Sequence, residues 1–237
     1  MSSTGLPQHI SKQFDNELEY IRSRVLSMGG LVEKQLTDAL SALMESDIEL
    51  GSAVLDTEYE VNAMEVSIDE ECTQILARRQ PAAGDLRLIT AVIKTITDLE
   101  RIGDEAERIA NMAIDLAEKQ GPKSYYIDIG SMGNYVRNMV HGALDAFARM
   151  DSKAALEIAG RDPGADAQYG AIVRQLITYM MEDPKNITSA MDTVWSARAM
   201  ERIGDHARNI CEYVIYFVEG KDVRHISLEE MEKEVKG

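Results

Sequence analysis

The sequence is poor in the residues that build sheets and disulfide frameworks. Aromatic residues make up 5% of the chain and proline occurs 5 times, while alanine, leucine, isoleucine, methionine and glutamate recur, which favours helices over twisted sheets. The only cysteines, Cys72 and Cys211, are far apart and lack a CxxC spacing, so neither a zinc ribbon nor a disulfide framework is indicated. We therefore expect an all-α protein with two buried free thiols.

Positive charge is also scarce. The 237 residues include 25 Lys and Arg against 41 Asp and Glu, which gives a formal net charge of −16. Because a nucleic-acid-binding surface needs a surplus of Lys and Arg, this balance argues against nucleic acid as a partner. Cations or basic protein surfaces are the expected partners.

Long apolar runs are missing as well. The segment MSSTGLPQHISKQF has no apolar core of a signal peptide, and no stretch approaches the roughly 18 apolar residues of a spanning helix. We expect a cytoplasmic protein that reaches a membrane only indirectly, through its partners. A hydrophobic content of 45% still allows a sizeable core.

The sequence does contain an internal repeat. The word ERIGD occurs at 100–104 and again at 201–205. At a shift of about 104 positions, DALSALMESD aligns with GALDAFARMD and EVSIDEECTQIL with YGAIVRQLITYM, and Pro81 falls on Pro184 at a shift of 103. Several matches in the same order along the chain indicate an internal duplication.

Each repeat unit is predicted to contain three helices. In the first unit, a helix over 14–44 is followed by one that Asp47 caps and that the segment RRQPAAGD ends. The remaining predicted helices cover 85–119 in the first unit and 132–150, 162–182 and 187–219 in the second. The linker is expected within KQGPKSYYIDIGS.

The third helix of each unit has the apolar spacing of a helical bundle, with steps of three and four residues. We interpret these positions as core: Leu99, Ile102, Ala106, Ile109, Ala113 and Leu116, and Met200, Ile203, Ala207, Ile210, Val214 and Phe217. The predicted fold is therefore two tandem three-helix bundles, which we expect to be joined end to end. The bundles are assigned to 11–120 and 129–220, with a short acidic tail at 221–237.

ERIGD combines features that are unfavourable within a helix. At about 100° per residue, Glu100 and Asp104 leave the apolar stripe on the same side, and Gly103 lies beside them. A mid-helix glycine costs about 1 kcal/mol and like charges four residues apart about 0.2 to 0.5 kcal/mol, so the repeated pattern suggests a functional site. The alternative is a solvated ion-pair ladder, in which Arg108 pairs with Asp104 and, in the second copy, Arg208 pairs with Asp205.

A second set of oxygen-bearing side chains occurs on the middle helices. Glu58 and Asn62 align with Asp162 and Asp166 at a shift of 104, and each pair has a spacing of four residues. If middle and third helices are antiparallel neighbours, each unit presents four such side chains, which would suit Mg, Mn or Fe. Because Asn62 is an amide, we expect it to lower the negative charge and the cation affinity of the first site, and Pro163 suggests that Asp162 of the second site caps its helix.

None of the four histidines is placed near these acids by the helical pattern. His206 follows an acidic position but points about 100° further round the helix. We therefore expect His206 to be exposed rather than a metal ligand.

Together, the two ERIGD words, the RRQPAAGDLR joint and the spaced acids resemble the PhoU family of phosphate transport accessory proteins. The resemblance extends from about His9 to His225 and includes QHISKQF, SMGGLVEKQL, MEVSIDE, DAFARMD and IVRQLITYMMED. It implies two three-helix bundles with surface metal clusters, often of iron or zinc. By match to the family motif, the implied metal ligands are Glu58, Asn62, Glu100 and Asp104, and Asp162, Asp166, Glu201 and Asp205.

The resemblance also implies a function. Members of this family are negative regulators of the phosphate-starvation (Pho) regulon and limit phosphate uptake. They act as cytoplasmic adaptors between the ATPase of the phosphate ABC transporter and a membrane sensor histidine kinase, and are often homodimers. Two alternatives remain open: a carboxylate-bridged metalloenzyme on a helical bundle, and a metal-free interaction protein whose acids contact basic partner surfaces.

Overall fold

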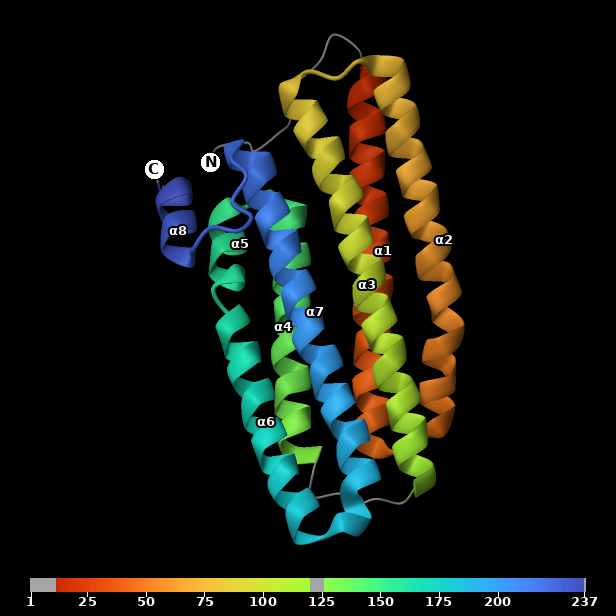
Figure 1. The fold of residues 1–237 in the computed structure, drawn as a ribbon. Coiled ribbons are helices and arrows are strands. Elements are labelled where there is room, and N and C mark those ends of the chain that lie inside the picture. The colour runs from red at the N-terminus through yellow and green to blue at the C-terminus, as the bar shows by residue number, and fades with distance from the viewer. Residues whose placement is uncertain (1–11, 120–125, 237) are drawn as a thin grey trace.

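The structure is a computed structural model that describes residues 12–119 and 126–236. The first unit consists of α1 (Lys12–Glu45), α2 (Ile48–Arg79) and α3 (Ala83–Lys119). The second consists of α4 (Tyr126–Arg149), α5 (Ser152–Ala159), α6 (Asp162–Glu182), the short 3₁₀ helix η2 (Pro184–Asn186) and α7 (Ile187–Glu219), and α8 (Leu228–Lys236) follows (Figure 1). The predicted all-α fold of two bundles is confirmed. Most of the predicted linker, His9 and the outermost positions 11 and 237 lie outside the described residues.

The corner between the first two helices has the same backbone conformation in both units. Ser46 and Met150 both adopt left-handed conformations, with φ of 59° and 52°. The following residue, Asp47 or Asp151, donates its N–H to the carbonyl five residues earlier, and its side chain accepts N–H groups of the next helix. The duplication is therefore visible in the backbone as well as in the sequence.

The second unit departs from the prediction at two helix boundaries. Its middle helix is divided into α5 and α6, and the sequence analysis missed α5 entirely. Gly160 ends α5, and the N–H of the next residue, Arg161, bonds to Ile158 O, three residues earlier, at 2.9 Å, so the helix that is continuous in α2 is interrupted here. In addition, α4 begins at residue 126 rather than 132, so part of the predicted linker is helical.

The bundles lie side by side, and the prediction of an end-to-end arrangement was wrong. The helices α3 and α7 run antiparallel and pack against each other, as do α1 and α4 (Figure 1). Close approach of α1 and α4 depends on two glycines. A Cβ at Gly29 would lie 2.5 Å from Leu144 Cδ2, and one at Gly133 would lie 2.6 Å from Leu40 Cδ2.

These two contacts are equivalent under the internal repeat, because Gly29 aligns with Gly133 and Leu40 with Leu144 at a shift of 104. The bundles are thus related by an approximate two-fold axis. The helices α3 and α7 form the second contact between the bundles. Both ERIGD segments lie on these helices, and Glu105 of α3 contacts Arg202 of α7 beside them.

The predicted core is confirmed. Every residue of the two third-helix stripes is buried except Phe217, which is partly buried against the core. The segment predicted as a tail contains α8, which packs on α5, and its residues Val223, Met231 and Val235 are buried. Within the described residues, no helix has both the length and the apolarity required to cross a bilayer.

Candidate metal centre

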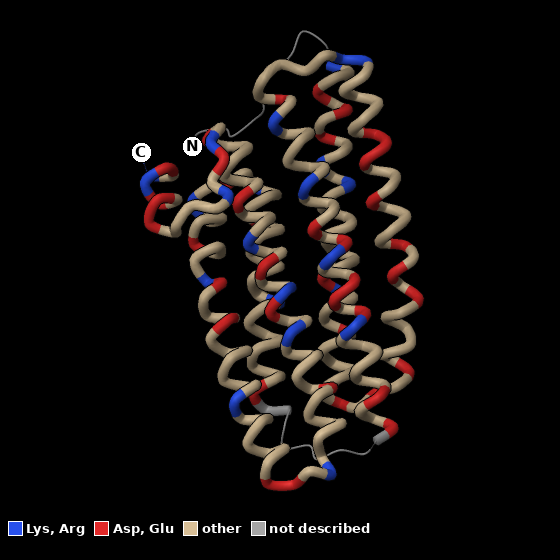
Figure 2. Tube along the Cα trace, in the orientation of Figure 1, with Lys and Arg blue, Asp and Glu red and all other residues tan. Residues whose placement is uncertain are grey.

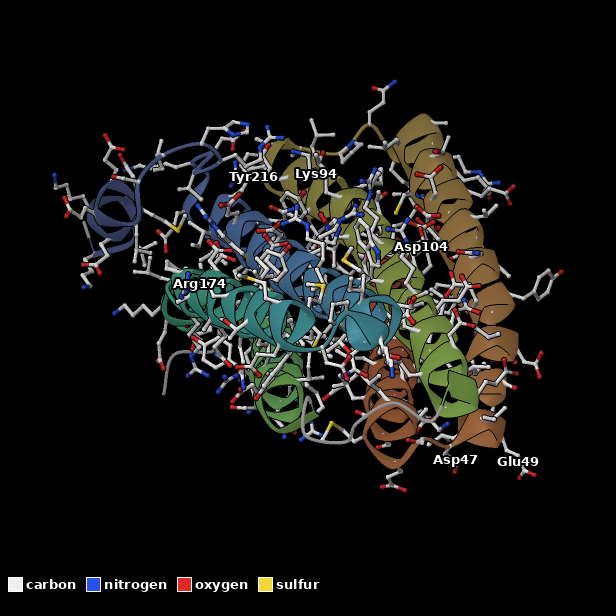
Figure 3. The ribbon with its side chains drawn as sticks, turned by 60° about the horizontal axis from the view of Figure 1, so that its bottom comes forward. Asp47, Glu49, Lys94, Asp104, Arg174 and Tyr216 are labelled. Carbon is white, nitrogen blue, oxygen red and sulfur yellow. The ribbon has the colours of Figure 1, made fainter. Side chains whose placement is uncertain are left out.

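Carboxylates from α2 and α3 gather on one side of the first bundle. One oxygen atom from each of Glu58, Asp104 and Glu107 lies within 4.8 Å of the others. Asp104 and Glu107 are three residues apart and so share a face of α3, and Asp104 lies on the side of α3 that faces α2 (Figure 3). We refer to these three residues together with Glu65 and Glu100 as the first carboxylate cluster.

Gly103 allows the helices to approach closely at this cluster. A Cβ at Gly103 would lie 3.1 Å from both Gln35 Oε1 of α1 and Glu58 Oε2 of α2. Gln35 Nε2 donates a hydrogen bond to Glu58 Oε2 at 2.8 Å. Glu58 is 8% exposed, and within the described residues its other oxygen, Oε1, is buried without a hydrogen-bond partner. Because Gly103 has no side chain, the buried carboxylate of Glu58 fits next to α3.

The acids of the first cluster repel one another. Burial raises the pKa of Glu58, the hydrogen bond from Gln35 opposes the rise, and the charges of Asp104 and Glu107 add to it. Burial and the charges of neighbouring carboxylates also raise the pKa of Glu100, to about 7. Among the described residues, none of the five acids of the cluster forms an ion pair with a Lys, Arg or His.

The first cluster fits a hard cation. Its donor atoms are carboxylate oxygens, which suit Mg, Mn or Fe better than zinc, since protein zinc sites favour nitrogen and sulfur ligands. Glu58 is one of the three residues with grouped oxygen atoms. Its Oε1 is also a buried acceptor that has no hydrogen-bond partner within the described residues. Glu58, Asp104 and Glu107 are therefore the residues that would hold the ion, with Glu100 adding negative charge beside them.

Two of the equivalent acids of the second bundle have arginine partners. Arg208 Nη1 lies 3.0 Å from Asp162 Oδ2, and Arg198 Nη1 lies 2.5 Å from Glu201 Oε1. Burial raises the pKa of both Glu201 and Asp205, and Arg198 acts in the opposite direction on each. We refer to Asp162, Asp166, Glu201 and Asp205 as the second carboxylate cluster.

The prediction that Asp162 caps its helix was wrong. Arg161 occupies the N-cap position of α6 without a side-chain cap hydrogen bond, and Asp162 is the first helical residue. Its side chain is 7% exposed and contacts Arg208 of α7. An ion pair to a facing helix has replaced the local hydrogen bond that the Pro163 pattern suggested.

The structure brings together only some of the predicted site residues. Glu58 and Asp104 meet directly, and Glu100 lies close enough for its pKa to respond to both. Asn62 and Asp166 are exposed, as is Asp205. Sequence reasoning missed Glu107, whose signal was its position three residues after Asp104, on the same helix face.

The ion-pair ladder proposed as an alternative is not formed within the described residues. Arg108 lies 3.4 Å from Glu105 rather than pairing with Asp104. Arg208 pairs with Asp162 and, at 3.1 Å, with Glu212, and not with Asp205. The acids of ERIGD are therefore not neutralised by the arginines that follow them on their own helices.

His206 is buried, contrary to the prediction that it is exposed. Its side chain is 10% exposed, and Nδ1 lies 2.6 Å from Asp98 Oδ1 on α3. Asn209 Nδ2 donates to the same oxygen at 3.1 Å. His206 is buried because α7 packs against both bundles. The face of α7 that bears His206 points away from the second bundle and packs against α3 of the first bundle.

Fold and site together define a class: helical proteins made of two tandem three-helix bundles, with a carboxylate cluster on each. A profile of the PhoU domain matches residues 25–113 and 129–214. The chain is 52% identical over 237 residues to a phosphate-specific transport system accessory protein PhoU homolog of Pseudomonas putida, covering 100% of this chain and 93% of the relative. It is 46% identical to the corresponding accessory protein of Escherichia coli, covering 100% and 98%.

Solved structures agree with these relatives. The crystal structure of PhoU from Pseudomonas aeruginosa superposes with a TM-score of 0.86 at 51% identity, covering 88% of this chain and 100% of that one. PhoU from Streptococcus pneumoniae, a phosphate transport system regulatory protein, gives a TM-score of 0.82 at 29% identity, covering 89% and 99%. The chain belongs to the PhoU family.

Proposed function

We propose that this protein is a non-enzymatic accessory protein of a phosphate transport system that limits phosphate uptake and represses the phosphate-starvation regulon. The supporting observation is the similarity to named accessory proteins of phosphate-specific transport along the whole chain. The predicted mode of action is that of a cytoplasmic adaptor between the ATPase subunit of the phosphate ABC transporter and the sensor histidine kinase of the regulon.

Deletion of the gene tests the regulatory role. In medium rich in phosphate, a deletion strain should express phosphate-starvation genes that the parent strain represses, and phosphate uptake should rise. Complementation with the intact chain should restore repression. Normal repression in the deletion strain would contradict the proposed function.

We further propose that the adaptor carries a hard divalent or trivalent metal ion on the first carboxylate cluster. Supporting this are the three grouped oxygens, the absence of ion pairs to these acids among the described residues, and the buried, unpartnered Glu58 Oε1. A bound cation would offset the mutual repulsion that raises the pKa of Glu58 and Glu100.

A pull-down tests the partners and the metal together. The purified ATPase subunit and sensor kinase are each presented to wild type and to the Glu58→Gln variant, with Mn²⁺ or with chelator. Retention of both partners by metal-loaded wild type supports the adaptor role. Equal retention by chelated protein would make the metal incidental, and metal-dependent turnover of a phosphoester that Glu58→Gln abolishes would contradict the non-enzymatic assignment.

The oligomeric state is a separate proposal. By family resemblance we propose a homodimer, which light scattering after size-exclusion chromatography would test. A mass near that of one 26.4 kDa chain at micromolar concentration would contradict it.

A further inference from the structure

The two carboxylate clusters differ in one equivalent position. At the 101-residue shift that superposes ERIGD on ERIGD, Glu107 aligns with Arg208. In the first bundle this position supplies the third carboxylate of the grouped oxygens. In the second bundle it supplies a guanidinium that contacts Asp162, the counterpart of Glu58.

The sign of the charge is therefore opposite at the same place in the two bundles. Arg208 reaches Asp162 Oδ2 at 3.0 Å and also Glu212 Oε1 at 3.1 Å, so its planar fork is fixed by two acids from different helices. The Arg208 side chain is 35% exposed, whereas its two partners, Asp162 and Glu212, are buried. This arginine is part of the packed structure of the second bundle.

A second arginine neutralises another acid of the second cluster. Arg198 pairs with Glu201 at 2.5 Å and also lies over the ring of Tyr169, with its guanidinium carbon 5.8 Å from the ring centroid. Tyr169 aligns with Glu65 of the first cluster at the 104-residue shift. Two acidic positions of the first cluster, Glu65 and Glu107, are thus replaced by tyrosine and arginine in the second.

We infer that the chain binds a metal ion at the first carboxylate cluster only, and that Arg208 is a built-in cation that takes the place of a metal ion at the second. This inference rests on the metal binding proposed above. The amide of Asn62 lowers the cation affinity of the first cluster only slightly, because Asn62 is neutral and exposed. Arg208 lowers the cation affinity of the second cluster more, because it adds a positive charge in contact with a buried carboxylate.

The second cluster retains the means to bind metal once the arginine is removed. Asp162 Oδ1 and Glu201 Oε2 are buried without hydrogen-bond partners within the described residues. Each belongs to a carboxylate whose other oxygen contacts an arginine. Replacing Arg208 should therefore convert the second cluster into a cation site.

Reciprocal charge exchange tests the inference, with Mn²⁺ as the probe and titration calorimetry and electron paramagnetic resonance as readouts. Wild type should bind one tightly held Mn²⁺ per chain. Glu107→Arg should weaken this binding at least about a hundredfold, because it brings a positive charge into the cluster. Arg208→Glu should add a second equivalent, and the double exchange should restore a single one.

Matched controls separate the local effect from net charge. Arg149→Glu makes the same charge change as Arg208→Glu at an exposed position of α4 that, among the described residues, pairs only with Asp145 on its own helix. Glu60→Arg makes the same change as Glu107→Arg at an exposed position of α2. Both controls should bind one Mn²⁺ with wild-type affinity.

Arg208→Gln guards against failure of Arg208→Glu to fold. It removes the charge without adding an acid, and a helical circular dichroism spectrum with a second, weaker Mn²⁺ equivalent supports the inference. Two equal sites in wild type, or one site in folded Arg208→Gln, would overturn the inference while leaving metal binding intact. No Mn²⁺ binding by wild type would overturn both this inference and the proposed metal ion.

Discussion

His206 Nδ1 lies 2.6 Å from Asp98 Oδ1 and joins α7 of the second bundle to α3 of the first. Both side chains are buried, and Asn209 donates a second hydrogen bond to the same carboxylate. Their counterparts in the repeat, Glu105 for His206 and Ala199 for Asp98, form no such pair within the described residues. Among the residues that the structure describes, this polar contact therefore occurs on only one side of the approximate two-fold relation between the bundles.

Asp98→Ala should destabilise the protein by about 2 to 3 kcal/mol, because it leaves His206 and Asn209 without their acceptor. Denaturant unfolding of this variant, of His206→Ala and of the double variant forms a double-mutant cycle. The coupling free energy should be on the order of 1 to 3 kcal/mol. Additive losses would show that the contact contributes nothing to the interface.

The pair of His141 and Glu33 is a matched control for that cycle. It also joins the two bundles, from α4 to α1, with Nδ1 2.8 Å from Oε1. The His141 side chain is 69% exposed, however, so solvent screens the contact. His141→Ala should cost less than about 1 kcal/mol.

Gly103→Ala should disturb the first carboxylate cluster even though alanine is the better helix former. The new methyl group would lie 3.1 Å from Glu58 Oε2, so that carboxylate must shift by a few tenths of an ångström. We expect Mn²⁺ affinity to fall at least about tenfold, measured by calorimetry, a loss of about 1.4 kcal/mol in binding free energy.

Gly30→Ala is the control for this substitution. Gly30 is also within a helix, and a Cβ there would meet no atom within 4 Å. The free energy of unfolding should rise by up to about 1 kcal/mol, and Mn²⁺ affinity should not change. A gain in stability for Gly103→Ala equal to that of Gly30→Ala, with unchanged affinity, would contradict the role assigned to Gly103.

The stability of the metal-free protein should fall as pH rises from about 4.5 to about 7. Burial, followed by the charges of Asp104, Glu65 and Glu58, raises the pKa of Glu100 to about 7 from its ordinary value of 4.5. Between these two values the unfolded chain loses the proton that the folded protein retains, so folding is favoured less as pH increases. Allowing for solvent screening, Glu100 should account for a loss on the order of 1 to 2 kcal/mol.

Glu100→Gln tests this assignment. In urea unfolding across that pH range, the variant should show a shallower decline than wild type. Saturating Mn²⁺ should also reduce the decline in wild type, because the ion binds the deprotonated cluster. Parallel pH profiles for wild type and variant would contradict the assignment.

The two equivalent helix caps should differ in importance. Asp47 caps α2, which has 32 residues, and its side chain accepts one N–H group of that helix. Asp151 caps α5, which has 8 residues, and its side chain accepts two. We expect each change to alanine to cost about 1 kcal/mol, with Asp151→Ala causing the greater local opening. Amide hydrogen exchange should show lost protection throughout α5 but only in the first turn of α2.

Most of the helices could be predicted from the sequence, because the apolar spacing reports the face that each helix turns to its own bundle. The interface between the bundles could not, because it lacks that signal. Its close contacts involve glycine, as at Gly29 and Gly133, and its buried groups include the charged residues Asp98 and Glu105, which a hydrophobic pattern assigns to solvent. Figure 2 shows that acidic and basic residues both occur along α3 and α7.

The candidate site was predictable to the same limited extent. The four-residue spacing showed that Glu100 and Asp104 share one helix face, and Glu58 was identified by the same spacing on the preceding helix. It gave no indication that Arg208 crosses to Asp162, a residue 46 positions earlier, since that contact depends on how α6 and α7 are placed. Alignment of the two repeats does reveal the exchange of Glu107 for arginine, once the whole helix face rather than the five-residue word is compared.

The approximate two-fold relation between Gly29–Leu144 and Leu40–Gly133 has a consequence for how such a protein can evolve. In a dimer of identical single bundles, every mutation at the shared surface appears twice, so a contact changed on one side of the axis changes in the same way on the other. Fusion into one polypeptide removes that restriction. Each half can then acquire different charges. Within the described parts of the chain, Asp98 contacts His206 on one side of the interface only, and Glu107 of the first bundle corresponds to Arg208 of the second.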